Sequence, residues 1–97
     1  EQKTAIAFAV EHDGMLGEAL KLIAGFRRDG FVSEMFATGS PRKRYDKAVK
    51  SGAEVIVSLN IVDGVEDIGF KSVGEGGNEI LAQIQDSLLG DPNTVVD

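Results

Sequence analysis

The chain has 97 residues, 42% of them hydrophobic, and a net charge of −6 at pH 7. This length allows one domain with a single core and is too short for two domains. The composition excludes a disordered chain, and no apolar run approaches the ~20 residues that span a bilayer. The lack of cysteine excludes disulfides, thiolate nucleophiles and cysteine-based zinc sites.

The sequence begins at Glu1 without a methionine, and we expect it to be a piece of a longer protein. Its first residues lack the basic, apolar and small-residue order of a secretory signal. Small secreted domains commonly depend on disulfides, and this chain has no cysteine to form them. We therefore expect a cytoplasmic location and no membrane partner.

The first half of the chain predicts strands and helices in alternation. The run TAIAFAV (4–10) is apolar without alternation, which is typical of a strand buried on both faces. After the turn EHDG (11–14), apolar residues recur at helical spacing until Gly30 ends the helix. The apolar stripe of this helix consists of Leu16, Ala19, Leu20, Ile23 and Phe26. Residues 31–37 (FVSEMFA) predict a second strand.

A break at TGSP (38–41) precedes the second helix. Ser40 suits the N-cap position and Pro41 the first helical position. Gly52 ends this helix, whose inward stripe is expected to consist of Tyr45, Ala48 and Val49. This stripe predicts that the charged side chains of the helix point to solvent.

The second half predicts two more strands and a last helix. Residues 54–59 (EVIVSL) form the third strand, 60–67 (NIVDGVED) a loop and 68–73 (IGFKSV) the fourth strand. After the break GEGG (74–77), a helix follows that Gly90 closes. Its apolar residues are Ile80, Leu81, Ile84, Leu88 and Leu89.

The order β-α-β-α-β-β-α predicts an α/β fold with three layers, α/β/α. Alternating strands and helices pair in parallel through right-handed crossovers, and the short connection before the fourth strand makes that strand antiparallel at an edge. We expect a mixed four-stranded sheet with three parallel strands, one antiparallel edge strand and three helices. Residues 1–90 would form this domain, and residues 91–97 a flexible tail.

Half of the positive charge lies on the second predicted helix. Residues 42–50 carry five cations and one anion, which gives the segment +4 and leaves −10 for the rest of the chain. The cations are Arg42, Lys43, Arg44, Lys47 and Lys50. In parallel sheets ligands bind beyond the carboxyl ends of the strands, where the loops 11–14, 38–41 and 60–67 are expected. The basic helix starts there, so its cations and its positive dipole end face the rim of the expected site.

The segment GSPRKRYDKAVKSGAEVIVSL (39–59) resembles the anticodon-binding domain of class II aminoacyl-tRNA synthetases, above all that of histidyl-tRNA synthetases. That family has a short basic helix, an Ala-x-x-x-Gly-Ala-like turn and then an apolar strand. Ala48, Gly52 and Ala53 occupy the turn positions here.

Two further stretches carry the resemblance. LGEALKLIAGFRRDGFVSEMF (16–36) is similar to the first helix and second strand of the family. VEDIGFKSV (65–73) resembles a family strand ending in Val-Lys-Asp-Leu, with Lys71 in the place of the lysine. The order of elements matches from about Thr4 to Gly90.

The resemblance implies that the chain binds the anticodon loop of a tRNA, while aminoacylation belongs to a class II catalytic core outside this chain. It places the RNA contacts at Thr38, Gly39, Ser40, Arg42, Lys43, Arg44 and Lys47. Arginine planes and amide donors suit unstacked bases, and phosphate contacts give salt-sensitive affinity. A second copy of the chain, in a homodimer formed through the parent protein, is a further candidate partner. DNA is not expected as a partner. The alternative for the cations is a solvated helix face without a ligand.

A second interpretation assigns the same fold to dimerisation or to a regulatory protein contact. The net charge of −6, the acids Glu11 and Asp13, and Asn60 in place of a family glycine favour it. Its candidate contacts are Val62, Val65 and the face of the last helix.

No catalytic, metal or cofactor site is predicted, and the chain is not expected to be an enzyme by itself. The single histidine, His12, has no nucleophile that the sequence pairs with it, and we expect it to be exposed in a loop. Glu11, Asp13 and Asp63 resemble the acidic cluster of receiver domains, but the later strands of that family are missing. VGEGGN (73–78) lacks the Lys-Ser/Thr of a phosphate loop, which favours a flexible turn.

Overall fold

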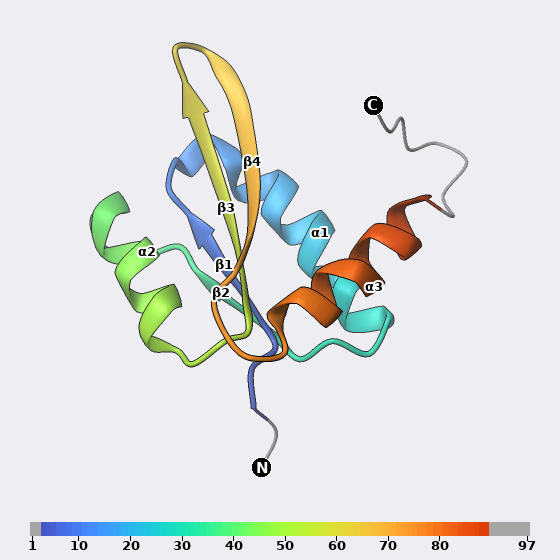
Figure 1. Cartoon of the computed structure of the whole chain (residues 1–97). Helices are drawn as coiled ribbons and strands as arrows, with labels where there is room; N and C mark the ends of the chain where they lie inside the picture. Colours follow the sequence, from blue (N-terminus) through green and yellow to red (C-terminus); the bar gives the residue numbers. More distant parts are fainter. Residues whose placement is uncertain (1–2, 90–97) are drawn as a thin grey trace.

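The computed structural model describes residues 3–89 and contains one mixed sheet with helices on both sides (Figure 1). In chain order the elements are β1 (Ile6–Val10), the 3-10 turn η1 (Asp13–Met15), α1 (Leu16–Arg28), β2 (Ser33–Phe36), α2 (Pro41–Lys50), β3 (Val55–Val62), β4 (Val65–Ser72) and α3 (Gly77–Leu89). Among residues 3–89, none of the helices has the length and hydropathy of a transmembrane span. The predicted tail (91–97) and the predicted helix stop Gly90 lie outside the described residues.

The strands lie in the order β2-β1-β3-β4. β1 runs parallel to both β2 and β3, so Phe8 lies between Met35 and Val57. β4 runs antiparallel to β3 and is the outer strand. The predicted fold class is confirmed: three parallel strands, an antiparallel edge strand and three helices form a three-layer α/β/α arrangement.

The two faces of the sheet differ because the central strand β1 alternates large and small residues. Ile6, Phe8 and Val10 join the core beneath α1 and α3, whereas Ala7 and Ala9 join the core beneath α2. All five side chains are fully buried, as predicted for a strand that is covered on both faces. The large residues therefore build the main core on one side, and the alanines leave a shallower layer for α2.

The buried face of α1 is turned by one residue relative to the prediction. The predicted stripe residues that are buried are Ala19, Ile23 and Phe26. Leu16 and Leu20 are exposed, and Met15 of η1 is fully buried in their place. Met15 lies four residues before Ala19 and therefore continues the same row, whereas Leu16 and Leu20 lie about 100° further round the helix.

The prediction of a loop at 60–67 is wrong, because β3 and β4 extend through these residues as a hairpin. Each strand has eight residues, and only Asp63 and Gly64 form the turn. Both have positive φ, 52° and 78°, as a type I′ turn requires and as the twist of paired strands favours. Asn60 and Asp67 look like loop residues in the sequence, but they face each other in the ladder.

The glycine-rich segment after β4 packs around Glu54. The Glu54 carbonyl accepts hydrogen bonds from the N–H groups of Val73 (2.9 Å) and Gly74 (3.2 Å). The Glu54 carboxylate pairs with the Lys3 ammonium at 2.9 Å and accepts the Gly76 N–H at 2.9 Å. These two bonds hold the pKa of Glu54 below its usual value, with the Lys3 bond the larger cause. The segment is thus a specific turn that joins β4 to α3.

The close packing at Gly77 gives a stability prediction. A methyl group at Gly77 would lie 2.5 Å from the Glu54 carbonyl oxygen and would collide with the Ser72 hydroxyl. Because a backbone oxygen cannot turn away, we expect Gly77→Ala to lower the free energy of unfolding by about 1–3 kcal/mol in urea denaturation.

Gly17→Ala is the matched control for that substitution. Nothing lies within 4 Å of a methyl group at Gly17, and alanine is the better helix former. The control should therefore raise the free energy of unfolding by about 0.5–1 kcal/mol. Equal stabilisation by both alanines would contradict the packing described for Gly77.

Candidate RNA-binding site

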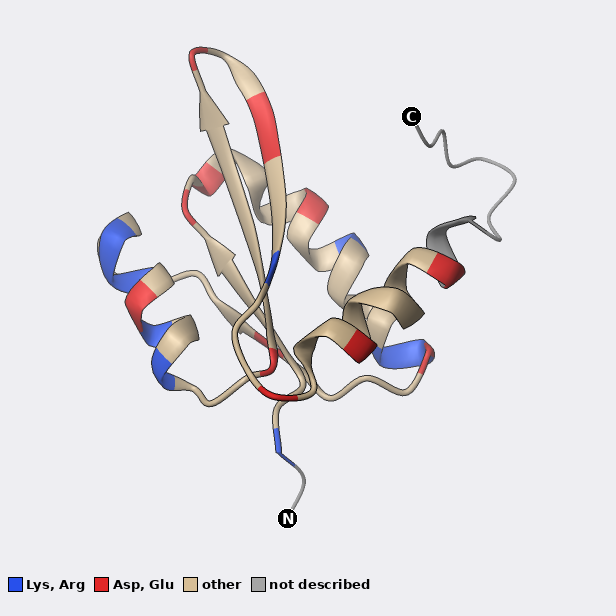
Figure 2. Ribbon diagram, in the orientation of Figure 1, with Lys and Arg blue, Asp and Glu red and all other residues tan. Residues whose placement is uncertain are grey.

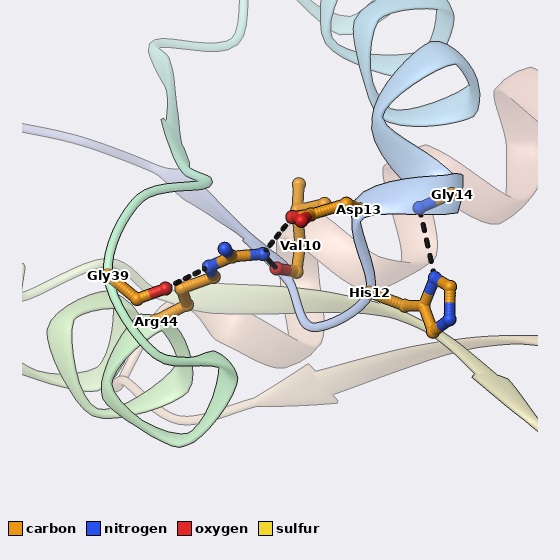
Figure 3. A network of polar contacts seen from close by, with 6 residues as sticks. All are labelled: Val10, His12, Asp13, Gly14, Gly39 and Arg44. Atoms are coloured by element: carbon orange, nitrogen blue, oxygen red, sulfur yellow. Dashed lines mark hydrogen bonds and ion pairs between the residues drawn. The ribbon is translucent and has the colours of Figure 1, made fainter.

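Two loops meet at the carboxyl ends of β1 and β2, and Arg44 of α2 ties them together (Figure 3). Its Nε donates a hydrogen bond to the Gly39 carbonyl at 3.1 Å. Its Nη1 donates to the Val10 carbonyl at 2.9 Å and to Oδ1 of Asp13 at 2.7 Å. One guanidinium therefore holds the end of β1, the start of η1 and the loop before α2.

Arg44 is only 7% exposed, so the prediction that it points to solvent is wrong. The cause is helical spacing, because Arg44 lies four residues before Ala48, through which α2 packs on the sheet. Val49, which was predicted to face inward, is exposed. Tyr45 is half-buried against the core, as predicted. The buried side of α2 thus directs Arg44 toward the two loops.

The buried charge of Arg44 is balanced by its neighbours. A guanidinium removed from water is stable only when oxygen acceptors replace the lost water, and Gly39, Val10 and Asp13 supply them. The Asp13 side chain remains 85% exposed, so only the cation is desolvated. Charge-assisted bonds of this kind are stronger than neutral ones, and they fix the position of both loops.

The other four cations of α2 are exposed, as predicted, and are Arg42, Lys43, Lys47 and Lys50. Figure 2 shows the basic residues gathered along this helix. Within residues 3–89 none of the four forms an ion pair. The Lys47 ammonium lies 3.6 Å from the position that a Cβ atom would take on Gly39. Lys47 therefore brings its charge to the loop, whereas Lys50 is the last residue of the helix.

The loop before α2 offers further polar groups. Gly39 has a φ of +86°, a backbone conformation that residues other than glycine rarely adopt. Ser40 occupies the predicted N-cap position and Pro41 the first helical position, but the Ser40 hydroxyl makes no capping bond. A helix start without a side-chain cap has amide donors that suit an anion. Together with the exposed Thr38, this loop can donate hydrogen bonds to phosphate or to base edges.

The opposite side of this rim is acidic. Glu11 follows β1 and is half-buried. Its burial raises its pKa, and the charge of Asp67 on β4 raises it further. A phosphate approaching between these carboxylates would be repelled. These carboxylates therefore make the α2 side of the rim the more favourable side for a polyanion.

His12 has a local structural role. Its Nδ1 accepts a hydrogen bond from the Gly14 N–H at 2.9 Å and so caps η1 (Figure 3). Its side chain is exposed, as predicted. Residues 3–89 hold no group of three or more histidine, aspartate or glutamate side chains that could bind a metal ion.

The predicted contact residues thus separate into two sets. Those exposed at one rim are Thr38, Gly39, Ser40, Arg42, Lys43 and Lys47. Arg44 lies beneath them and bonds to protein oxygens. Sequence reasoning missed the partners of Arg44, namely Asp13 and the Val10 carbonyl. The spacing between Arg44 and Ala48 was the signal that could have revealed the burial of Arg44.

Comparison with known proteins gives one relative. Over 85 residues, or 88% of this chain, the sequence is 34% identical to a protein described as histidine--tRNA ligase from Novosphingobium aromaticivorans. The chain spans about a fifth (20%) of the length of that protein. No family model matches the chain, and no solved structure matches it. The chain is therefore related to a segment of an aminoacyl-tRNA synthetase, as the sequence resemblance predicted.

The Arg44 network can be tested by stability. Arg44→Met keeps an apolar side chain but leaves the Gly39 and Val10 carbonyls without their donor. We expect the free energy of unfolding to fall by about 2–4 kcal/mol in urea denaturation. The matched control is Lys43→Met at the neighbouring exposed position. This substitution should change the free energy of unfolding by less than about 0.5 kcal/mol. Equal effects of the two substitutions would contradict the assigned role of Arg44.

Glu11 gives a pH-dependent prediction. Because its pKa is raised in the folded chain, the ionised carboxylate opposes folding, and this cost grows as the pH rises from the ordinary glutamate pKa through the raised one. Glu11→Gln should therefore be more stable than the wild type at pH 7, by less than about 1 kcal/mol because water screens a half-buried group. The difference should disappear in acid. Thermal unfolding across the pH range measures it, and a wild type more stable at neutral pH would refute the assignment.

Proposed function

We propose that this chain is the tRNA anticodon-binding domain of a histidyl-tRNA-synthetase-like protein. The observation that carries the proposal is the 34% identity to part of a histidine--tRNA ligase. Residues 1–90 would be the domain and residues 91–97 a tail. Aminoacylation would belong to a catalytic part outside this chain, and this domain would contribute affinity and selection in the cytoplasm without a cofactor.

The surface chemistry of α2 supports RNA as the ligand. Arg42, Lys43 and Lys47 are exposed and make no ion pair within residues 3–89, so binding them to phosphate breaks no protein contact. Each phosphate contact releases counterions and makes the affinity dependent on salt. The planar guanidinium of Arg42 can also stack on an unpaired base of an RNA loop.

The loop of Thr38, Gly39 and Ser40 would add hydrogen bonds to the same RNA. Arg44 would act as a positioning residue, because its bond to the Gly39 carbonyl fixes this loop beside α2. The acids Glu11 and Asp67 would disfavour RNA on the far side of the rim. The domain would thus present a single basic surface to a single-stranded loop.

A second candidate function is self-association or contact with another protein. The observation that favours it is the set of exposed apolar side chains on the hairpin and the end of β4: Val62, Val65, Ile68, Phe70 and Val73. The net charge of −6 also opposes RNA binding away from α2. This function does not exclude RNA binding, because α2 packs against β1 and does not cover β4.

The RNA proposal predicts a salt-sensitive complex with an anticodon stem-loop of a histidine tRNA. We expect Arg42→Glu combined with Lys43→Glu to weaken binding at least about tenfold and to reduce the slope of log affinity against log salt by about 0.7 for each lost phosphate contact. Fluorescence anisotropy with a labelled RNA measures both quantities.

The control for this pair makes the same change in net charge, but at positions away from the loop. Lys21→Glu combined with Lys50→Glu changes the charge equally, at α1 and at the last residue of α2. It should weaken binding much less than the pair at 42 and 43. The proposal fails if the wild-type chain does not bind the stem-loop at roughly 50 mM salt, or if both double variants have the same effect.

A further inference from the structure

The outer edge of β4 is long, regular and open. β4 is the last strand of the sheet and has eight residues, and its continuous register with β3 contains no bulge and no proline. In Figure 1 β4 lies in front of β3, and no helix crosses it. The opposite edge, β2, has only four residues. Long flat edges invite a further strand, and proteins usually shorten, kink or cover them.

The free hydrogen-bonding groups of this edge belong to alternate residues. Val62 pairs with Val65 across the two-residue turn, and the Val73 N–H donates to the Glu54 carbonyl at 2.9 Å. The odd-numbered residues of β4 therefore direct their backbone groups toward β3. The residues whose N–H and C=O groups point to the open edge are Glu66, Ile68, Phe70 and Ser72.

The sequence of β4 is complementary to itself when it is read in the opposite direction. In an antiparallel pair centred on Gly69, Asp67 of one chain lies opposite Lys71 of the other, and Ile68 lies opposite Phe70. Each of these matches occurs twice because of the two-fold symmetry. The same register places Val65 opposite Val73 and Glu66 opposite Ser72. Asp67 and Lys71 thus meet opposite charges, Glu66 meets a neutral polar residue, and the apolar residues meet apolar ones.

The free backbone groups select this register. Ile68 and Phe70 both direct their groups outward and would form a hydrogen-bonded pair, whereas Asp67 and Lys71 would form a non-hydrogen-bonded pair with close side chains. A shift of one residue on each chain would centre the pair on Ile68 or on Phe70. Either shift places Asp67 and Lys71 opposite uncharged residues, so only the register centred on Gly69 matches both kinds of contact.

We propose that β4 pairs with β4 of a second copy of this chain, antiparallel and centred on Gly69. The two four-stranded sheets would join into one continuous sheet. Ile68 and Phe70 of both copies, which are 38% and 37% exposed in the single chain, would cover each other on the side of α1 and α3. Asp67 and Lys71 would form two ion pairs on the side of α2.

This inference rests on the second candidate function, for which it names the surface and the partner. It is independent of RNA binding, because α2 and the loop before it lie over β1 and not at the β4 edge. The interface would involve one strand from each chain, so we expect a dimer that forms with rising concentration and dissociates on dilution.

Charge reversal tests the pairing by sedimentation equilibrium of the 97-residue chain. Asp67→Lys places lysines opposite Lys71, and Lys71→Asp places acids opposite Asp67, so each substitution converts two attractions into two repulsions. Each should weaken the dimer at least about tenfold. The double variant Asp67→Lys with Lys71→Asp restores both pairs and should recover wild-type dimerisation. Both side chains are exposed, so circular dichroism should show all variants folded.

Amide hydrogen exchange by NMR gives a second readout. On raising the concentration, the N–H groups of Glu66, Ile68, Phe70 and Ser72 should gain protection, since they point to the open edge. The N–H groups of the odd-numbered residues are already bonded to β3 and should change little. This alternation distinguishes strand pairing from a contact made only by apolar side chains.

Three results would overturn the proposal. The first is a chain that stays monomeric at its highest soluble concentration. The second is a dimer that the single charge reversals leave intact, which would keep the second candidate function but place its surface elsewhere. The third is loss of the dimer on removing residues 91–97 with no effect of charge reversal, which would make that segment the occupant. Wild-type stem-loop affinity in the Lys71→Asp variant, whose residue has no role in the proposed RNA site, would show that the result does not depend on the RNA proposal.

Discussion

The structure of the candidate site depends on one buried guanidinium. Arg44 reaches from the first turns of α2 to three oxygens, those of Gly39, Val10 and Asp13. A buried cation with fewer partners would oppose folding, so the two loops must stay where these oxygens can meet it. Arg44 is therefore a buried cation that holds the loops, whereas Arg42, Lys43 and Lys47 are exposed beside them. The exposed lysines and Arg42 depend on it for their place beside the loop.

The sheet explains why this helix lies where it does. Ala7 and Ala9 present a flat, small surface to α2, while Phe8 and its neighbours fill the thicker core under α1 and α3. A helix that packs through Ala48 on alanines buries little apolar area. The Arg44 bonds thus add an anchor where the hydrophobic contact is small. The core under α1 and α3 contains most of the buried apolar side chains. The smaller core under α2 supports the helix that presents the positive charge.

The two halves of the sheet have different chemistry at their margins. The rim at the ends of β1 and β2 combines cations and loop donors, which suit an anionic loop. The hairpin of β3 and β4 extends beyond this rim with Asp67 near Glu11, and its outer edge offers backbone groups and apolar side chains. One small domain can therefore have a ligand surface on a helix and a protein surface on a strand, and neither blocks the other.

The sequence by itself determined the fold class, the order of the elements and the concentration of positive charge on α2, because alternating apolar runs, glycine breaks and local charge are properties of short segments. It also determined the relation to an aminoacyl-tRNA synthetase. The Asp63-Gly64 pair and the spacing of Arg44 from Ala48 are local signals for the hairpin and for the buried arginine. Only the tertiary structure decided which oxygens Arg44 bonds to, and that Leu16 and Val49 stay exposed. Each of these depends on which side of a helix faces the sheet, or on a contact with a segment more than 30 residues away. Packing between distant segments settles such choices, because helical spacing alone does not decide which of two neighbouring rows of side chains is buried.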